Sequence, residues 1–329
     1  MRTFSKVALL LTALSILVLF SACTKASEDP LKIATNLWVG NEPLYLAAKL
    51  NFLKPAKYKF IEYASATEVI RALRNKSVDM VVLTMDEVAQ LVQDGVDPKL
   101  ILVLDESFGA DALIASSKVK NISQLKGKRI GVEQTALGKF FLSLFLEKYK
   151  LQESDFQIVN LEVSKHPAAF KNRQVDAVFT FEPFLGEIKK MGGQVLFDSK
   201  STPGQIIDVL VVRPEVFNTH KDEIKEIIQV WGKTLSYISE NKEESIQLMS
   251  ERMNISVSDF KSALAKINLI DLDRNIELLD GLQAIRNLFR KLAQQLKHPT
   301  TPLGLQDEAV KFESFHPVPL DWYKINRGK

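Results

Sequence analysis

Cysteine is almost absent from the 329-residue sequence, because Cys23 is the only one. The chain therefore cannot form an internal disulfide bond, and it lacks the cysteine clusters that hold structural zinc. The four histidines are scattered, and none stands at a metal-binding spacing; they are His166, His220, His298 and His316. We therefore expect no metal site.

Sequence signatures of catalysis are missing as well. The chain has no Gly-x-Ser-x-Gly nucleophile elbow, no Gly-rich phosphate loop followed by Lys and Ser or Thr, and no dinucleotide fingerprint. These absences argue against hydrolases, nucleotide-dependent enzymes and oxidoreductases. We expect a protein that is not an enzyme, needs no cofactor and leaves its ligand chemically unchanged.

An excess of charge of either sign is also lacking. The formal net charge is +3, and two of the positive charges, Arg2 and Lys6, stand at the extreme N-terminus. Nothing in this balance indicates a nucleic-acid partner. With 46% hydrophobic and 25% charged residues, the chain is long enough for one large α/β domain or two lobes of ordinary size.

The first residues follow the plan of a secretory signal. A short basic start, 1–6, leads into an apolar run, 7–20, and then into the small residues Ser21 and Ala22. The run is short for a bilayer span, which takes about 20 residues. We therefore expect residues 1–22 to be a signal peptide, the alternative being an uncleaved membrane anchor.

The end of this segment, Leu19-Phe20-Ser21-Ala22-Cys23, resembles a bacterial lipobox. The resemblance implies cleavage before Cys23 and a diacylglycerol on its sulfur, although Phe20 stands where Leu is usual. It also implies a membrane-anchored lipoprotein on the periplasmic or cell-surface side. Polar residues 23–30 are expected to form a tether, and Thr24 leaves open which membrane holds the anchor.

Strand-like and helix-like segments alternate after residue 30, which is typical of a parallel sheet covered by helices. The expected strands are 31–37, 58–63, 78–83, 129–133, 155–161, 175–180 and 206–212. The expected helices are 43–53, 67–74, 86–94, 138–149, 167–171, 220–240, one opening at the capping box of Ser256, and 275–296. The helical C-terminal third is expected to pack on the sheet, although a dimerising tail is an alternative.

One stretch recurs with nearly the same letters. Asn75-Lys76-Ser77-Val78-Asp79-Met80-Val81 matches Asn172-Arg173-Gln174-Val175-Asp176-Ala177-Val178. Each then reaches a Thr-x-acid sequence, at Thr84 and at Thr180. The pattern indicates two similar βα units, whether it reflects a true repeat or only a common helix–turn–strand connection.

Polar and aromatic residues collect where the expected strands end. In α/β sheets, ligands bind at the carboxyl ends of strands. The candidate ligand-binding residues are Trp38, Gly40, Asn41, Thr84, Asp86, Gly109, Asp111, Glu133, Thr135, Phe181 and Glu182. Each also has an ordinary structural explanation, such as a helix cap for Asp86, a turn for Gly40 or a core position for Trp38.

Three motifs carry a family resemblance. They are Trp38-x-Gly40-x-x-Pro43-Leu44, Leu125-Lys126-Gly127-Lys128-x-Ile130-Gly131-Val132 and Val175-Asp176-Ala177-Val178-x-Thr180-x-Glu182-Pro183. The sequence resembles the nitrate, sulfonate and taurine-type binding proteins of ABC transporters, and also the binders of thiamine-pyrimidine precursors. The resemblance implies a type II periplasmic-binding-protein fold, in which a ligand cleft lies between two lobes. We expect 31–110 and 213–329 to form the first lobe and 111–212 the second, hinge crossovers included.

This resemblance implies capture of a small molecule and its delivery to an inner-membrane ABC permease, by a monomer. The acids at the strand ends favour a nitrogen-containing ligand such as an amine, an aminosulfonate or a pyrimidine. Two alternatives remain: a ligand-sensing lipoprotein that feeds a membrane signalling protein, and a pyrimidine-synthesising enzyme of the same fold. The enzyme is disfavoured because it uses a Cys-rich motif and Cys23 is the sole cysteine.

The lipobox generates a direct test. Metabolic labelling with a fatty acid should mark the wild-type chain and should not mark Cys23→Ser, since no other thiol exists. Equal labelling of the two chains would contradict lipidation at this residue.

Overall fold

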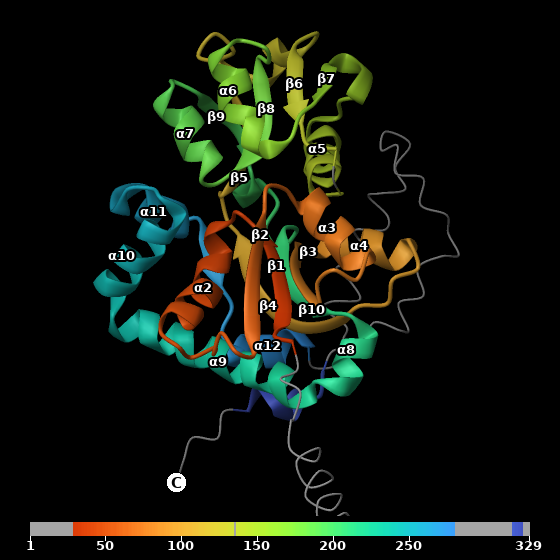
Figure 1. Cartoon of the computed structure of the whole chain (residues 1–329). Helices are drawn as coiled ribbons and strands as arrows, with labels where there is room; N and C mark the ends of the chain where they lie inside the picture. Colours follow the sequence, from red (N-terminus) through yellow and green to blue (C-terminus); the bar gives the residue numbers. More distant parts are fainter. Residues whose placement is uncertain (1–28, 135, 280–317, 325–329) are drawn as a thin grey trace, which may run out of the picture. The chain divides into compact units, whose positions relative to one another are not determined.

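The computed structural model describes residues 29–134, 136–279 and 318–324 of the chain (Figure 1). The chain divides after Pro30 into two units, and every element described below belongs to the second unit, which begins at Leu31. The expected signal, tether residues up to 28 and Cys23 lie outside the described residues.

A six-stranded sheet has the strand order β11-β4-β10-β3-β1-β2. The strands are β1 (Leu31–Asn36), β2 (Tyr58–Tyr63), β3 (Met80–Thr84), β4 (Lys99–Ser107), β10 (Ile207–Val212) and β11 (Ile267–Leu269). β1, β2 and β3 are parallel, whereas β10 runs antiparallel to β3 and β4. The central strands β3, β4 and β10 are rich in Val, Leu and Ile because helices cover both faces of the sheet.

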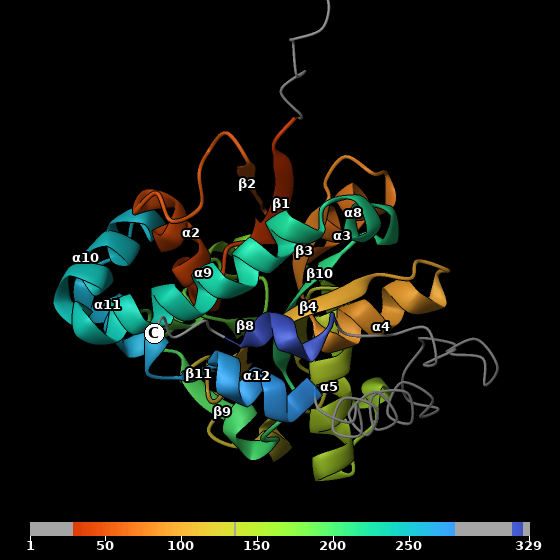
Figure 2. The same cartoon turned by 90° about the horizontal axis from the view of Figure 1, so that it is seen from below.

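Helices surround this sheet. They are α2 (Glu42–Lys49), α3 (Ala66–Arg74), α4 (Met85–Gln93), α8 (Pro214–Thr219), α9 (Lys221–Glu240), α10 (Lys242–Met253), α11 (Val257–Leu264) and α12 (Leu272–Leu279), with the short turns η1 (Val39–Asn41) and η7 (Leu320–Tyr323). Figure 2 shows α9 running past the sheet with α12 and η7 beside it. A helix does begin at Ser256, whose hydroxyl accepts a hydrogen bond from the Asp259 N–H at the start of α11, but of the expected capping box the structure shows only this N-cap bond.

A five-stranded sheet has the order β7-β6-β8-β5-β9. Its strands are β5 (Asp111–Ala115), β6 (Arg129–Val132), β7 (Gln157–Asn160), β8 (Ala177–Phe181) and β9 (Gln194–Asp198). Its helices are α5 (Ala136–Tyr149), α6 (His166–Lys171) and α7 (Phe184–Lys190), with short turns η2 (Ile122–Leu125), η3 (Glu153–Asp155), η4 (Val163–Lys165) and η5 (Ser199–Ser201). Phe141 of α5 stacks on Phe197 of β9, with ring centroids 5.0 Å apart, so aromatic packing fastens the helix to the sheet.

The repeated stretch forms the same turn and the same hydrogen bond in both sheets. Lys76 and Arg173 both turn the chain with a φ of 56°. Asp79 then accepts the backbone N–H of Lys32 at 2.8 Å, and Asp176 accepts that of Arg129 at 3.0 Å. Each aspartate thereby ties the start of one parallel strand to the start of its neighbour. The two similar βα units are confirmed.

Two crossovers connect the sheets. The chain passes from β4 to β5 and returns from β9 to β10. Strand β10, which lies inside the segment 111–212, pairs with β3 and β4 of the six-stranded sheet. We propose that the lobes follow the two sheets, so that the second lobe ends near Asp198 instead of at residue 212.

The predicted α/β fold is confirmed, although the sequence analysis left several elements unassigned. Strands β4, β5, β9 and β11 and helix α10 were not expected. Of the expected helix 275–296, the structure describes α12, which begins at Leu272, and residues from 280 onward lie outside the described part. None of the described helices is both long enough and apolar enough to span a bilayer.

A buried amide holds α12 on the edge of the first sheet. Asn275 accepts the Val103 N–H at 2.8 Å and donates to the Val103 carbonyl at 2.9 Å. Asn275→Ala leaves both backbone groups buried without a partner, which should lower the free energy of unfolding by about 2 kcal/mol or more. Urea unfolding measures the change. Asn268→Ala, at an exposed position, is the control and should shift stability by less than about 0.5 kcal/mol; equal effects would contradict the role of Asn275.

Candidate functional site

The carboxyl ends of strands from both sheets meet around one small cavity. Its volume is about 20 Å³, which is room for roughly one water molecule. The lining residues are Asn36, Trp38, Ala66, Thr84, Glu87, Asp111, Leu137, Phe181, Ile206 and Asp208. Four of the predicted site residues are therefore brought together here, namely Trp38, Thr84, Asp111 and Phe181. The cavity lies where open α/β sheets bind ligands.

Two aromatic rings, one at a strand end of each sheet, contact each other. Trp38 follows β1 and Phe181 ends β8, and their ring centroids lie 5.7 Å apart in an edge-to-face arrangement. The Trp38 Nε1–H donates to both oxygens of Asp105, at 3.3 and 3.2 Å. A Cβ at Gly40 would overlap the Asp105 carboxylate and the indole nitrogen. Only glycine at position 40 therefore permits the Trp38 indole and the Asp105 carboxylate to lie this close to the backbone.

Two acidic side chains stand on neighbouring strands of the six-stranded sheet. Asp208 of β10 stands opposite Asp105 on β4 and opposite Thr84 on β3. Like charges placed directly opposite each other on neighbouring strands destabilise a sheet. Burial raises the pKa of Asp105 to about 7, although the hydrogen bond from Trp38 lowers it. Burial, and next the charge of Asp105, raise the pKa of Asp208 well above its ordinary value.

Two further acids aim unpartnered oxygens into the cavity. Asp111 Oδ2 and Glu87 Oε1 are buried and have no hydrogen-bond partner among the described residues. The second oxygen of Glu87 accepts the Thr84 N–H at 3.0 Å. Burial raises the pKa of each of these carboxyl groups to about 7. Such groups call for a partner that carries a positive charge or an N–H donor.

Three predicted residues lie near the cavity without lining it. The Asn41 amide donates to the Asn36 carbonyl at 2.9 Å and so holds the turn after β1. Asp86 is buried at the start of α4, where burial and then the charge of Glu87 raise its pKa well above the ordinary value. Glu133 follows β6, and burial raises its pKa to about 8. Thr135 lies outside the described residues.

Gly109 belongs to the crossovers. Its N–H donates to the Ser199 hydroxyl at 2.6 Å, and the Ser199 hydroxyl lies 2.8 Å from that of Ser107. Gly109 has a φ of 104°, a conformation that favours glycine. The two connections between the sheets are thus joined side by side.

Glu182 is placed away from the cavity. It forms an ion pair with Lys266, which precedes β11, and it accepts the Gly186 N–H at 3.0 Å. Close by, Lys190 of α7 pairs with Asp259 of α11 at 2.5 Å. Glu182 borders a separate hollow of about 430 Å³ together with Phe184, Lys190 and Asp259. The ion pair joins the end of β8 to the residue before β11, and ligand binding by Glu182 stays a prediction.

The sequence analysis missed Glu87, Asp105 and Asp208. A signal was present for two of them, since Asp105 and Asp208 interrupt strands that are otherwise largely apolar. A carboxyl group in such a run is buried at considerable cost and usually serves a function. Among the described residues no group of three or more His, Cys, Asp and Glu is arranged to hold a metal ion.

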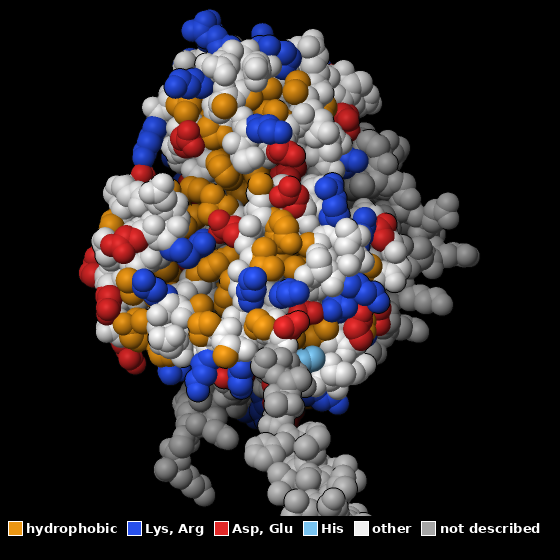
Figure 3. Space-filling view, in the orientation of Figure 1, with side chains coloured by type: hydrophobic (Ala, Val, Ile, Leu, Met, Phe, Trp, Pro, Cys, Tyr) orange, Lys and Arg blue, Asp and Glu red, His pale blue; other side chains and the backbone are white. Residues whose placement is uncertain are grey.

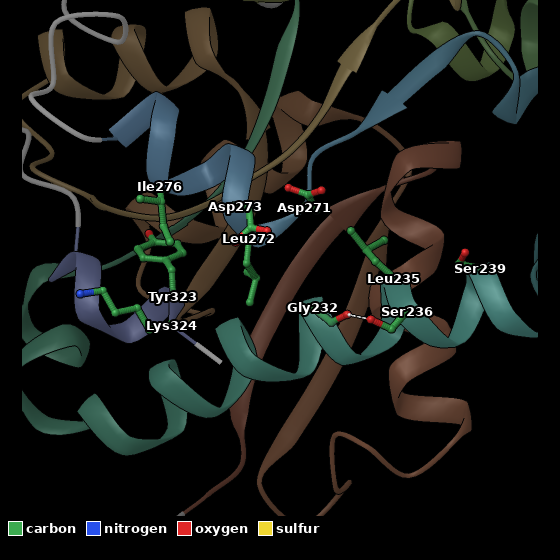
Figure 4. Close-up of a pocket in the computed structure, with 10 residues that line it drawn as sticks. All are labelled: Gly232, Leu235, Ser236, Ser239, Asp271, Leu272, Asp273, Ile276, Tyr323 and Lys324. Atoms are coloured by element: carbon green, nitrogen blue, oxygen red, sulfur yellow. Dashed lines mark hydrogen bonds between the residues drawn. The ribbon is translucent and has the colours of Figure 1, made fainter. Parts of the chain in front are cut away.

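A wider hollow of about 540 Å³ lies between α9, α12 and η7 (Figure 4). It is lined by Gly232, Leu235, Ser236, Ser239, Asp271, Leu272, Asp273, Ile276, Tyr323 and Lys324. Residues 280–317 follow α12 directly and lie outside the described part. We therefore assign no ligand to this hollow.

A family profile described as "NMT1/THI5 like" matches residues 40–261. The chain belongs to this family. The match begins at Gly40 and includes every strand of the five-stranded sheet. Together with the relatives and solved structures named below, this match confirms the predicted resemblance.

Several family relatives are named as binding proteins. A protein of Brucella abortus with that name is 25% identical over 218 residues, 62% of this chain and 66% of its own length. A protein of Bacillus subtilis named for binding aliphatic sulfonates is 26% identical over 218 residues, 64% of this chain and 66% of its own. The taurine-binding periplasmic protein of Escherichia coli is 25% identical over 168 residues, 50% of this chain and 52% of its own. The chain matches slightly less than two thirds of the first relatives.

Solved structures confirm the predicted fold. The alkanesulfonate-binding protein of Xanthomonas axonopodis has a TM-score of 0.68 at 18% identity, covering 81% of this chain and 94% of that one. The ligand-binding component of an ABC-type import system from Staphylococcus aureus has a TM-score of 0.71 at 16% identity, covering 91% and 99%. These neighbours are named as binding proteins and not as enzymes.

The Glu182–Lys266 pair generates a test of how the sheets are joined. Glu182 keeps only 4% of its side chain exposed, so Lys266→Met leaves a buried charge without its partner and should lower the free energy of unfolding by about 3 kcal/mol. Adding Glu182→Gln should restore most of the loss. Lys261→Met is the control: its partner Glu243 is 76% exposed, and the loss should stay below about 1 kcal/mol. Urea unfolding that gives equal losses for both lysines would contradict the assignment.

Proposed function

We propose that the chain is the extracytoplasmic solute-binding component of an ABC importer. The family and the fold support this assignment, since the relatives and structural neighbours are named as binding proteins. The chain would act as a monomer, tethered through a lipid on Cys23, and would hand its ligand to a permease in the inner membrane. It would bind the ligand without altering it.

Lobe separation would admit the ligand. With a volume of about 20 Å³, the cavity takes no organic molecule in the closed arrangement. The linked crossovers at Gly109 and Ser199 supply a hinge, because loop segments beside strand ends can absorb changes in backbone angles. The contact between Trp38 and Phe181, which come from the two different sheets, would break on opening and form again on closure.

The proposed ligand is a small organic molecule that carries a positively charged or N–H-bearing nitrogen, such as an amine or a pyrimidine. The observation that carries this proposal is the lining: three carboxyl groups and two aromatic rings, with no Lys, Arg or His among the lining residues. Carboxylates can pair with a nitrogen cation, and aromatic faces attract it.

A bare sulfonate does not suit this lining. An anion needs arginine, backbone N–H groups or a helix N-terminus free of carboxylates. Here the first turn of α4 carries Asp86 and Glu87. The first turn of α5, whose Leu137 lines the cavity, carries no acid, but the buried Glu133 stands three residues before this helix. The face shown in Figure 3 has acidic and basic side chains interspersed, without a continuous basic area that would draw anions in. We therefore propose that the ligand differs in charge from the sulfonates for which the Bacillus and Xanthomonas proteins are named.

Three two-carbon compounds test the charge of the ligand: ethylammonium, taurine and ethanesulfonate. Ethylammonium should raise the melting temperature of the protein most, taurine less and ethanesulfonate not at all, because only the ammonium group has partners in the cavity. At one hundred times Kd the stabilisation would be about 2.7 kcal/mol. Differential scanning fluorimetry measures the shift.

Two variants serve as the comparison in this experiment. Asp111→Asn should abolish the shift by ethylammonium, since Asp111 Oδ2 is an unpartnered oxygen of the cavity. Asp222→Asn, on an exposed residue of α9, should keep it. A larger shift by ethanesulfonate than by ethylammonium would contradict the proposed ligand class.

A further inference from the structure

The carboxyl groups of Asp105 and Asp208 form a pair at the floor of the cavity. They stand directly opposite each other on adjacent antiparallel strands, and both are buried. Two buried carboxyl groups at neighbouring positions without a cation cannot both stay ionised, so we infer that the pair holds one proton. Strand β10 lies at the centre of its sheet, between β3 and β4, so the backbone fixes the two residues in this position.

Trp38 decides which of the two acids carries that proton. Its indole N–H donates to both oxygens of Asp105, and such a donor stabilises the ionised form of its acceptor. Asp208 has no such donor and is raised further in pKa by the charge of Asp105. The proton therefore belongs to Asp208, the member of the pair that lines the cavity.

Other acids surround the pair and add to its negative charge instead of neutralising it. Asp111 on β5, Glu87 on α4 and Glu106 on β4 all add negative charge. Lys266, which precedes β11, is paired with Glu182. Within the described residues no Lys, Arg or His forms an ion pair with Asp105, Asp208, Asp111 or Glu87. A positive charge that enters the cavity thus meets carboxyl groups only.

We propose that Asp208 selects for a cationic ligand by proton exchange: the closed, empty cavity keeps a proton on Asp208, and the bound cation takes the place of that proton. This inference rests on the proposed function and names the group that recognises the ligand's charge. On binding, the O–H bond of Asp208 breaks, the proton passes to the solvent, and the carboxylate pairs with the cation. The net charge of the site is unchanged, so a neutral or anionic molecule gains nothing from the exchange.

The first test needs no ligand. Folded-state pKa values above the unfolded value mean that the folded protein holds more protons, so stability is greatest at low pH and falls as the pH rises through about 7. Each such proton changes the unfolding equilibrium constant by about tenfold per pH unit. Urea unfolding between pH 5 and 8 should show this fall in the wild type. Asp208→Asn should reduce the slope by about one proton, because the amide N–H replaces the shared proton, and the exposed Asp222→Asn should not.

The second test uses ethylammonium, which stays cationic throughout this range. Calorimetry at pH 6.5 in two buffers with different ionisation enthalpies should show that the wild type releases about one proton more per bound ethylammonium than Asp208→Asn. Affinity should rise more steeply from pH 6 to pH 8 in the wild type than in Asp208→Asn.

The outcomes separate the two proposals. Equal slopes for wild type and Asp208→Asn would overturn the shared proton, whatever the ligand is. Binding without proton release would overturn the exchange and leave the importer function standing. Absence of ethylammonium binding at both pH values, with the difference in slope observed, would contradict the ligand class and with it the exchange.

Discussion

Burial of carboxyl groups without cations is the constraint around which the site is built. A carboxylate loses its hydration when two sheets close over it, and the protein must supply hydrogen bonds or keep the group protonated. Here the Trp38 indole satisfies Asp105, the Thr84 N–H satisfies one oxygen of Glu87, and Asp208 and Asp111 receive less. The missing partners identify the chemistry that a ligand must bring.

The surrounding fold serves this arrangement. Gly40 allows the indole to reach Asp105, and the parallel order of β1 and β3 brings Trp38 and Thr84 to the same edge. The second sheet supplies Asp111 and Phe181 from neighbouring strands, directly opposite each other. The ion pairs Glu182–Lys266 and Lys190–Asp259 lie outside this cavity and join elements of the two sheets.

Much of the fold could be predicted from local patterns. The alternation of strands and helices, the helix start at Ser256 and the repeated turns before Asp79 and Asp176 all depend on short stretches of sequence, and the structure confirms them. The site was harder, because it depends on which strands become neighbours. Asp105 and Asp208 are 103 positions apart in number yet face each other across β4 and β10, and no local pattern shows an antiparallel return strand. The sequence also could not show that Glu182 pairs with Lys266, because the two residues lie far apart along the chain.

The charge of the natural ligand tests the account most directly. The protein should be purified from its own cells without a denaturant, then unfolded, and the released small molecules identified by mass spectrometry. The account predicts a stoichiometric compound with a cationic or N–H-bearing nitrogen, retained by wild type and lost from Asp111→Asn. Recovery of a sulfonate, nitrate or another simple anion, held equally by both chains, would contradict it.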